Sequence, residues 1–112
     1  MSIFITQGRY TDSAIKGMVD KPEDRSKAVA ALMESVGAKL LNYYVTLGKY
    51  DFLVVIEGDN LTDVVGALMV AGSTGGVTNL TTTQAMTTQQ AEAAMKKANA
   101  TRAKFAPAGG GG

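Results

Sequence analysis

The sequence predicts an α+β domain whose elements follow the order β-α-β-β-α-β, with one more helix near the C-terminal end. Four short segments rich in β-branched and aromatic residues predict the strands, two apolar stripes at helical spacing predict the main helices, and turn residues separate them. The 112 residues fit one domain of ordinary size. With 46% apolar or aromatic residues and 2 prolines, the composition is that of a folded core.

The first half of the chain predicts a strand and two helices. Residues 3–10 are strand-like, and a short helix is expected over 12–18. A second helix is expected to begin at Pro22, because proline suits the first helical position and acidic residues follow it. Gly37 is a natural C-cap for this helix. Its apolar stripe consists of Val29, Leu32, Met33 and Val36.

The second half predicts a hairpin, a helix, a fourth strand and a last helix. Asp59 or Asn60 caps the first of these helices, and Thr87 with Gln90 offers a capping box for the last one. This order is that of the ferredoxin-like fold, a four-stranded antiparallel sheet with both main helices on one face and the first and third strands at its centre. The expected strand ranges are 38–47, 50–57 and 77–86.

The third strand is apolar on both of its faces. Phe52 and Val54 alternate with Leu53 and Val55, so a lone two-layer domain would leave one apolar face in water. Because monomers rarely expose a large apolar patch, we expect a second copy to cover this face by sheet-on-sheet packing. The interface candidates are Leu41, Tyr43, Leu53 and Val55.

Composition excludes several classes of function. The chain has no cysteine and no histidine, which removes disulfides, thiolate nucleophiles, cysteine-based zinc sites and the commonest acid-base side chain. A net charge of +1 gives no nucleic-acid footprint. The N-terminus lacks a signal-peptide pattern and no apolar run is long enough for a membrane span, so a cytoplasmic location is expected.

The turn at residues 48–51, Gly-Lys-Tyr-Asp, continues into the strand at 52–57, and related features lie at 8–11, 17, 22–25 and 80–86. With these features, residues 3–98 resemble the GYD-domain family of small bacterial and archaeal proteins, which is named after a Gly-Tyr-Asp signature. Here Lys49 separates the glycine from Tyr50 and Asp51. The resemblance implies a dimeric α/β barrel in which two ferredoxin-like sheets pack face to face. Relatives by fold range from cofactor-independent monooxygenases, isomerases and haem-handling enzymes to ligand sensors, so the fold leaves function open.

The turn at residues 48–51 is the strongest candidate site, because it combines an ammonium, a phenol and a carboxylate. The same residues also suit an ordinary hairpin, in which Asp51 accepts backbone hydrogen bonds. Strand alternation predicts that Tyr50 and Asp51 point to opposite faces. Other tyrosines could line an aromatic-ligand pocket or simply pack, and Lys16 could hold an anion or be solvated. The ligand-binding candidates are Tyr10, Lys16, Tyr44, Tyr50 and Asp51.

The favoured function is a cytoplasmic homo-oligomeric module that binds a small organic ligand, with no cofactor, no metal, no nucleic acid and no membrane. One alternative is a cofactor-independent enzyme on an aromatic or carbonyl substrate, with Asp51 or Glu57 as base. Another is a structural assembly protein. The expected domain spans 1–105, and a glycine-rich tail spans 106–112.

Overall fold

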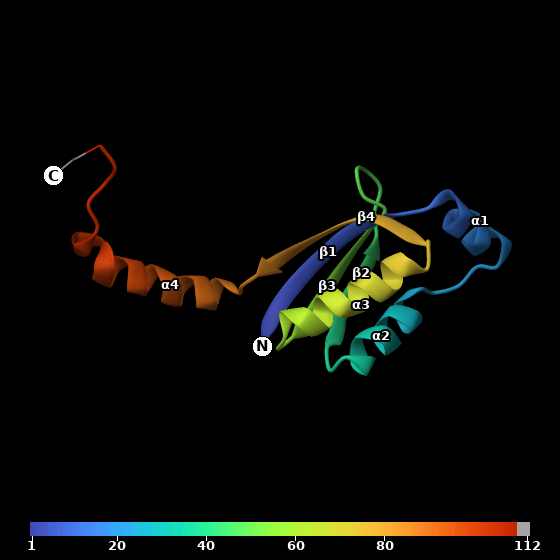
Figure 1. The fold of residues 1–112 in the computed structure, drawn as a ribbon, viewed down its shortest axis with the longest axis horizontal. Coiled ribbons are helices and arrows are strands. Elements are labelled where there is room, and N and C mark those ends of the chain that lie inside the picture. Colours follow the sequence, from blue (N-terminus) through green and yellow to red (C-terminus); the bar gives the residue numbers. More distant parts are fainter. Residues whose placement is uncertain (110–112) are drawn as a thin grey trace.

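The computed structural model describes residues 1–109 of the chain (Figure 1). It confirms the expected order of strands and helices. The elements are β1 (Ser2–Tyr10), α1 (Asp12–Asp20), α2 (Ser26–Ser35), β2 (Lys39–Val45), β3 (Phe52–Gly58), α3 (Leu61–Ser73), β4 (Val77–Ala85), α4 (Thr88–Thr101) and a 3₁₀ turn, η1 (Arg102–Lys104).

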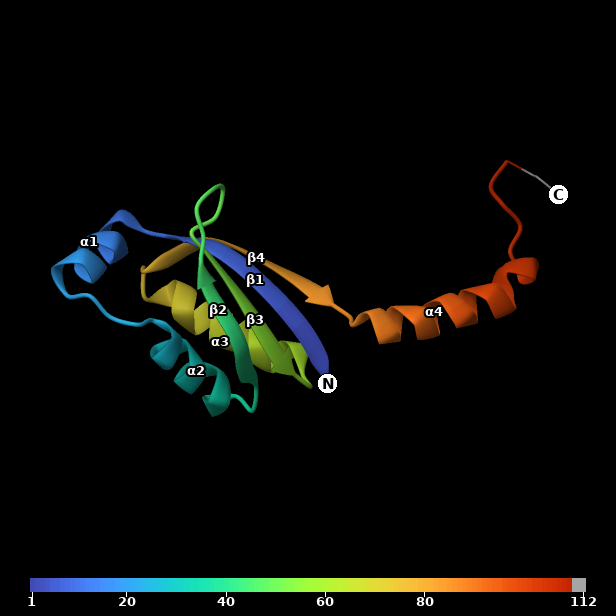
Figure 2. The same ribbon diagram turned by 180° about the vertical axis from the view of Figure 1, so that it is seen from behind.

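The four strands form one antiparallel sheet in the order β2-β3-β1-β4, so β1 and β3 are central as predicted. Helices α2 and α3 lie side by side along one face of the sheet (Figures 1 and 2). Along β3, Phe52, Val54 and Ile56 are buried beneath these helices, whereas Leu53 and Val55 on the opposite face are only partly buried. Within residues 1–109 no helix covers that opposite face, which we call the uncovered face.

The core lies between the sheet and the two helices. Its buried apolar side chains are Phe4, Met33, Ala38, Phe52, Val54, Ile56, Val64 and Ala67. Thr6 is the one buried polar side chain in the described residues, and its hydroxyl lies 2.8 Å from that of Thr82. Because this hydrogen bond satisfies both groups across the β1–β4 pair, the polar residue is accommodated in the core.

Helix α2 begins four residues later than the sequence predicts. The structure places Pro22 in the connection, and the helix begins at Ser26. The Asp24 carboxylate accepts hydrogen bonds from the Ser26 hydroxyl at 2.7 Å and from its backbone N–H at 3.0 Å. These bonds lower the pKa of Asp24 and set the start of the helix here, because a carboxylate that accepts from the backbone N–H two residues on satisfies a free donor of the first helical turn. Gly37, with φ of 76°, follows the helix as predicted.

A β-bulge in β2 changes which residues share a face. Leu40 pairs with Ile56 and Asn42 pairs with Val55, so Leu41 is the extra residue. Beyond the bulge, Tyr43 lies opposite Val54 on the helix-covered side, and Tyr44 lies opposite Leu53 on the uncovered face. The predicted grouping of Tyr43 with Leu53 and Val55 is therefore wrong, because one inserted residue reverses the alternation.

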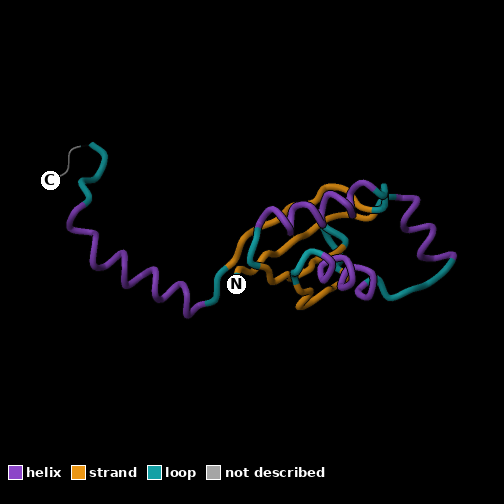
Figure 3. Tube along the Cα trace, turned by 60° about the horizontal axis from the view of Figure 1, so that its bottom comes forward, coloured by secondary structure: helices purple, strands orange, loops and turns teal. Residues whose placement is uncertain are grey.

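Helix α4 runs away from the sheet in every view (Figures 1 and 3). The predicted capping box is present, since the Thr87 side chain accepts from the Gln90 backbone and the Gln90 side chain accepts from the Thr87 backbone. The molecule consequently measures 65 × 30 × 22 Å. Of the expected tail at 106–112, the last three residues lie outside the described residues.

Gly8 in β1 is required by close packing. A Cβ at this position would lie 2.7 Å from both Phe52 Cζ and Leu80 Cδ2. We expect Gly8→Ala to lower the free energy of unfolding by ~1–3 kcal/mol, as overpacking does in closely packed cores. Urea denaturation measures this change.

Gly66→Ala provides the matched control, because a Cβ there meets no atom within 4 Å outside its own helical turns. Alanine favours a helix interior by roughly 1 kcal/mol over glycine, so this variant should be as stable as the parent or more stable. Equal stability of the two alanine variants would contradict the packing argument.

Candidate functional site

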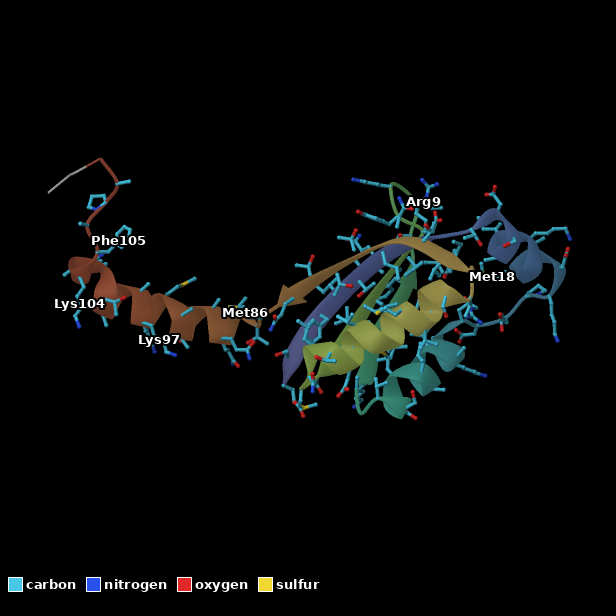
Figure 4. The ribbon with its side chains drawn as sticks, in the orientation of Figure 1. Arg9, Met18, Met86, Lys97, Lys104 and Phe105 are labelled. Atoms are coloured by element: carbon cyan, nitrogen blue, oxygen red, sulfur yellow. The ribbon has the colours of Figure 1, made fainter. Side chains whose placement is uncertain are left out.

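A cavity of about 530 Å³ lies between the helix-covered side of the sheet and the helices α1, α2 and α3. It is at the end of the molecule where α1 lies, opposite α4, and Met18 of α1 is one of its wall residues (Figure 4). Its walls are mainly apolar. The principal apolar wall residues are Met18, Val29, Leu32, Phe52, Leu68 and Val77. Such a volume and lining are typical of small-molecule sites.

Two tyrosines place polar groups on this apolar wall. The hydroxyls of Tyr10 from β1 and Tyr43 from β2 are 2.5 Å apart. The Phe52 ring lies against both, with ring centres 5.0 Å from Tyr10 and 6.1 Å from Tyr43. Because Phe52 is itself packed over β1 at Gly8, the three rings hold one another in place. The hydroxyl pair is thus a fixed polar point in an apolar cavity.

Burial, together with the hydrogen bond from Tyr10, raises the pKa of the Tyr43 phenol well above its usual range. The phenol therefore remains protonated at neutral pH and acts as a neutral hydrogen-bonding group. It is poorly suited to be a base or a nucleophile, since both roles need an accessible phenolate.

Charged residues stand at the rim of the cavity, on the connection between α1 and α2. Arg25 Nη1 lies 3.1 Å from Glu23 Oε1, so these two charges offset each other. Lys21 also lines the cavity and has no carboxylate within 4.0 Å among residues 1–109. The rim therefore carries one uncompensated positive charge beside an apolar interior.

A family model for the GYD domain matches residues 4–95 of this chain. The chain belongs to the GYD-domain family. A curated relative from Thermus thermophilus, named a glutamine synthetase and cystathionine beta-lyase binding protein, is 30% identical over 81 residues, which are 72% of this chain and 85% of the relative.

Solved structures agree with this assignment at the level of the fold. A Thermus thermophilus protein, TTHA0845, has a TM-score of 0.51 at 15% identity, over 78% of this GYD-domain chain and 95% of that one. A Pyrococcus horikoshii hypothetical protein, PHS023, has a TM-score of 0.50 at 16% identity, over 78% and 92% of the two chains.

Three of the predicted ligand-binding residues of this GYD domain lie at separate places in the structure. Tyr10 lines the large cavity. Lys16 is exposed and forms an ion pair with Asp20 at 2.6 Å. Tyr44 lies on the uncovered face and is 56% exposed. Of these three, only Tyr10 is placed to contact a molecule in the large cavity.

Tyr50 and Asp51 precede β3, so strand alternation does not govern their directions. The Tyr50 hydroxyl lies 3.2 Å from the Thr81 hydroxyl, which places it toward the uncovered face rather than with Phe52. The Asp51 carboxylate accepts a hydrogen bond from the Tyr10 backbone N–H at 3.0 Å. The Asp51 backbone N–H in turn donates to the Gly8 carbonyl at 2.8 Å. Asp51 thus ties the β2–β3 loop to β1.

Tyr43, which the sequence assigns to the interface candidates, lies instead in the wall of the large cavity. The signal that decides its position is the bulge at Leu41, and no glycine or proline marks that bulge. The apolar stripe of α2 did identify Val29, Leu32 and Met33 as inward-facing, and all three line the cavity.

Residues 1–109 contain no group of three His, Cys, Asp or Glu side chains placed to hold a metal ion. None of the helices in this described part is both long and apolar enough to span a membrane.

The raised pKa of Tyr43 predicts a pH dependence of stability. An unfolded tyrosine titrates near pH ~10, whereas the folded Tyr43 retains its proton at higher pH. The stabilisation from its neutral phenol is therefore complete below pH ~10 and declines as pH rises further, because only the unfolded chain releases this proton. We expect Tyr43→Phe to lose ~1 kcal/mol at neutral pH and to show a smaller alkaline decline.

Tyr44→Phe is the matched control for this test, because the neighbouring ring is exposed. Denaturation at neutral pH and above pH ~10 measures both variants. If the free energy of unfolding declines equally above neutral pH in Tyr43→Phe and in the parent chain, the raised pKa of Tyr43 is contradicted.

Proposed function

We propose that this GYD-domain protein is a binding module for a small organic molecule with an apolar body and one polar or anionic group. The observation that supports this proposal is the cavity of about 530 Å³, with apolar walls and a fixed pair of tyrosine hydroxyls. Its volume lies in the range of small-molecule sites, and a few well-placed polar groups in an apolar lining are what orient a ligand.

The wall and rim define the ligand chemistry. A planar ring or an aliphatic chain suits the surface formed by Phe52 and Leu32. A carbonyl or hydroxyl can exchange hydrogen bonds with Tyr10 and Tyr43, since the pair carries two protons and uses one in its mutual bond. A carboxylate would be drawn to Lys21 at the rim.

Binding is favoured over catalysis by the positions of the carboxylates. Glu23 is the only carboxylate among the cavity residues, and it is paired with Arg25. The Asp51 carboxylate accepts a hydrogen bond from the Tyr10 backbone N–H. Glu57 lies on the face of β3 opposite to the buried side chains, and therefore on the side away from the cavity. The alternative of a cofactor-independent enzyme needs a base beside the substrate, and these contacts supply none within residues 1–109.

Filling the cavity from α2 tests this proposal. Ala28 lines the cavity yet is exposed, so Ala28→Phe should occupy ligand space without disturbing the core. The probe is anilinonaphthalene sulfonate, which combines an aromatic body with an anion. We expect Ala28→Phe to weaken its binding by ~tenfold or more in a fluorescence titration, as loss of apolar contact area requires.

Ala31→Phe is the matched control, because Ala31 is exposed on the same helix and does not line the cavity. It should bind the probe as the parent does. Native mass spectrometry of the purified parent protein would identify any ligand that it retains. Unchanged probe binding by Ala28→Phe would remove the cavity from consideration.

We infer in addition that two copies pair through the uncovered face. Leu53, Val55 and Ile5 meet there across β3 and β1, flanked by Tyr44 on β2. Apolar side chains on adjacent strands of one sheet face form the kind of surface that sheet-on-sheet packing buries. This arrangement is the dimeric barrel expected for the family.

Leu53→Asp tests the pairing, because it would place an uncompensated charge in the buried interface. We expect the dimer dissociation constant to rise by ~100-fold or more. Val65→Asp on α3 is the control, since Val65 is 42% exposed on a helix that does not contact the uncovered face. Light scattering at micromolar concentration measures both, and a monomeric parent protein would contradict the proposal.

A second candidate function is binding to another protein. It is favoured by the Thermus relative, which is named for binding glutamine synthetase and cystathionine beta-lyase. The projecting helix α4, with Met95 66% exposed, offers this chain a surface for such contacts. Co-elution with purified glutamine synthetase that persists in Ala28→Phe would separate this function from ligand capture in the cavity.

A further inference from the structure

A second cavity, of about 290 Å³, lies where the β2–β3 loop meets β1 and β4. Arg9, labelled in Figure 4, stands at this end of the sheet. The cavity takes no part in the ligand binding proposed for the large one, and Tyr50 and Thr81 place it beside the uncovered face through which two copies are proposed to pair. Its lining residues are Arg9, Lys49, Tyr50, Asn79, Leu80 and Thr81.

The charges in this second cavity are unbalanced. Arg9 and Lys49 both line it, and no carboxylate does. The nearest acidic contact is Asp51, whose Oδ2 atom lies 3.9 Å from Arg9 Nε while accepting from the Tyr10 backbone N–H at 3.0 Å. Neither cation donates a side-chain hydrogen bond to another residue within 1–109. Two like charges in one depression favour the entry of an anion.

The neutral groups of the second cavity add hydrogen-bond donors. The Tyr50 and Thr81 hydroxyls share one hydrogen bond of 3.2 Å, which uses one of their two protons. The Asn79 side-chain oxygen accepts from Thr78 at 3.0 Å, which leaves the amide N–H groups for a ligand. The cavity thus offers N–H and O–H groups from several residues toward one space.

The local backbone brings these groups together. The β1–β4 register shifts between Gln7 and Arg9, and Asn79 adopts φ of 55°, a conformation that few residues other than glycine take. Bulges of this kind redirect side chains. On the other wall, Lys49 Nζ lies 5.6 Å from the Tyr50 ring centre, within reach of a cation–π interaction that keeps its charge at the cavity.

We propose that this second cavity is a binding site for a small oxyanion, the phosphate or carboxylate group of a metabolite, held by Arg9 and Lys49. The Arg9 guanidinium can donate two parallel N–H bonds to neighbouring oxygens of either group. Lys49 supplies a mobile point charge, and the Tyr50–Thr81 pair supplies an O–H donor. The site does not depend on occupancy of the large cavity, because the two share only Leu80.

Nuclear magnetic resonance of the isotope-labelled full chain tests this site. The chain is titrated separately with inorganic phosphate and with succinate. We expect saturable shifts at the backbone amides of Lys49, Tyr50 and Thr81, and none at Leu32 in the large cavity, with a dissociation constant on the order of 1 mM. Tighter binding of phosphate assigns the site to phosphorylated compounds, and tighter binding of succinate assigns it to carboxylates. Absence of saturation with both anions overturns the proposal.

Two double variants that remove the same charge distinguish specific binding of an anion in the second cavity from nonspecific attraction of the anion to a positively charged protein. Arg9→Gln with Lys49→Gln should weaken binding of the better anion by ~tenfold or more, as loss of charge-assisted hydrogen bonds does. Lys97→Gln with Arg102→Gln removes the same two charges from the exposed α4 and η1 region, and should change binding less than ~twofold. Equal weakening in both doubles overturns the proposal.

The single variant Lys49→Gln covers the case in which the Arg9 change disturbs folding, because Lys49 is exposed in a loop and its side chain makes no hydrogen bond within residues 1–109. It should retain the amide spectrum of the folded parent and bind the anion more weakly than Lys97→Gln does. Parental affinity in Lys49→Gln also overturns the proposal.

Discussion

The packing of Phe52 over the bare backbone of β1 at Gly8 is the contact on which both cavities depend. Because Gly8 has no side chain, the Phe52 ring approaches β1 closely. The same ring packs against the rings of Tyr10 and Tyr43. Immediately before Phe52, Asp51 bonds to Gly8 and to Tyr10, which fixes the end of the loop that carries Lys49. One close approach between the two central strands therefore positions the tyrosine pair on one side of the sheet and the cationic wall on the other.

The two sides of the sheet offer different chemistry for a physical reason. On the helix-covered side, burial and the hydrogen bond with Tyr10 raise the pKa of Tyr43, so this phenol acts in its neutral form. In the single chain the second cavity, beside the β2–β3 loop, is open to water, where Arg9 and Lys49 keep their charges at little cost. The two proposed sites would therefore differ in the size of the apolar surface that they offer to a ligand.

Much of the fold was predictable because it follows from local patterns. The helical stripes and the Thr87 capping box each have a signature in nearby residues, and the strand order follows from the order of the elements and the handedness of their connections. The candidate site was less predictable, because it depends on single-residue departures from regular pairing. The bulge at Leu41 reverses the side on which Tyr43 lies, and the start of β3 at Phe52 releases Tyr50 from strand alternation. Neither departure has a sequence signal such as glycine or proline at its position.

Helix α4 shows how a segment remains ordered when the sheet does not support it. It runs out from the end of β4, and the family model stops inside it, at residue 95. Five of its 14 residues are alanine, and its first turn is closed by its own capping box. Local features, namely its alanine content, the capping box and the Glu92–Lys96 ion pair of 3.7 Å, favour the helix, which is marginally stable at this length without tertiary packing. A helix held only by local interactions can therefore be lost on its own: one proline in its middle would break α4 and leave the packing of the sheet against α2 and α3 unchanged.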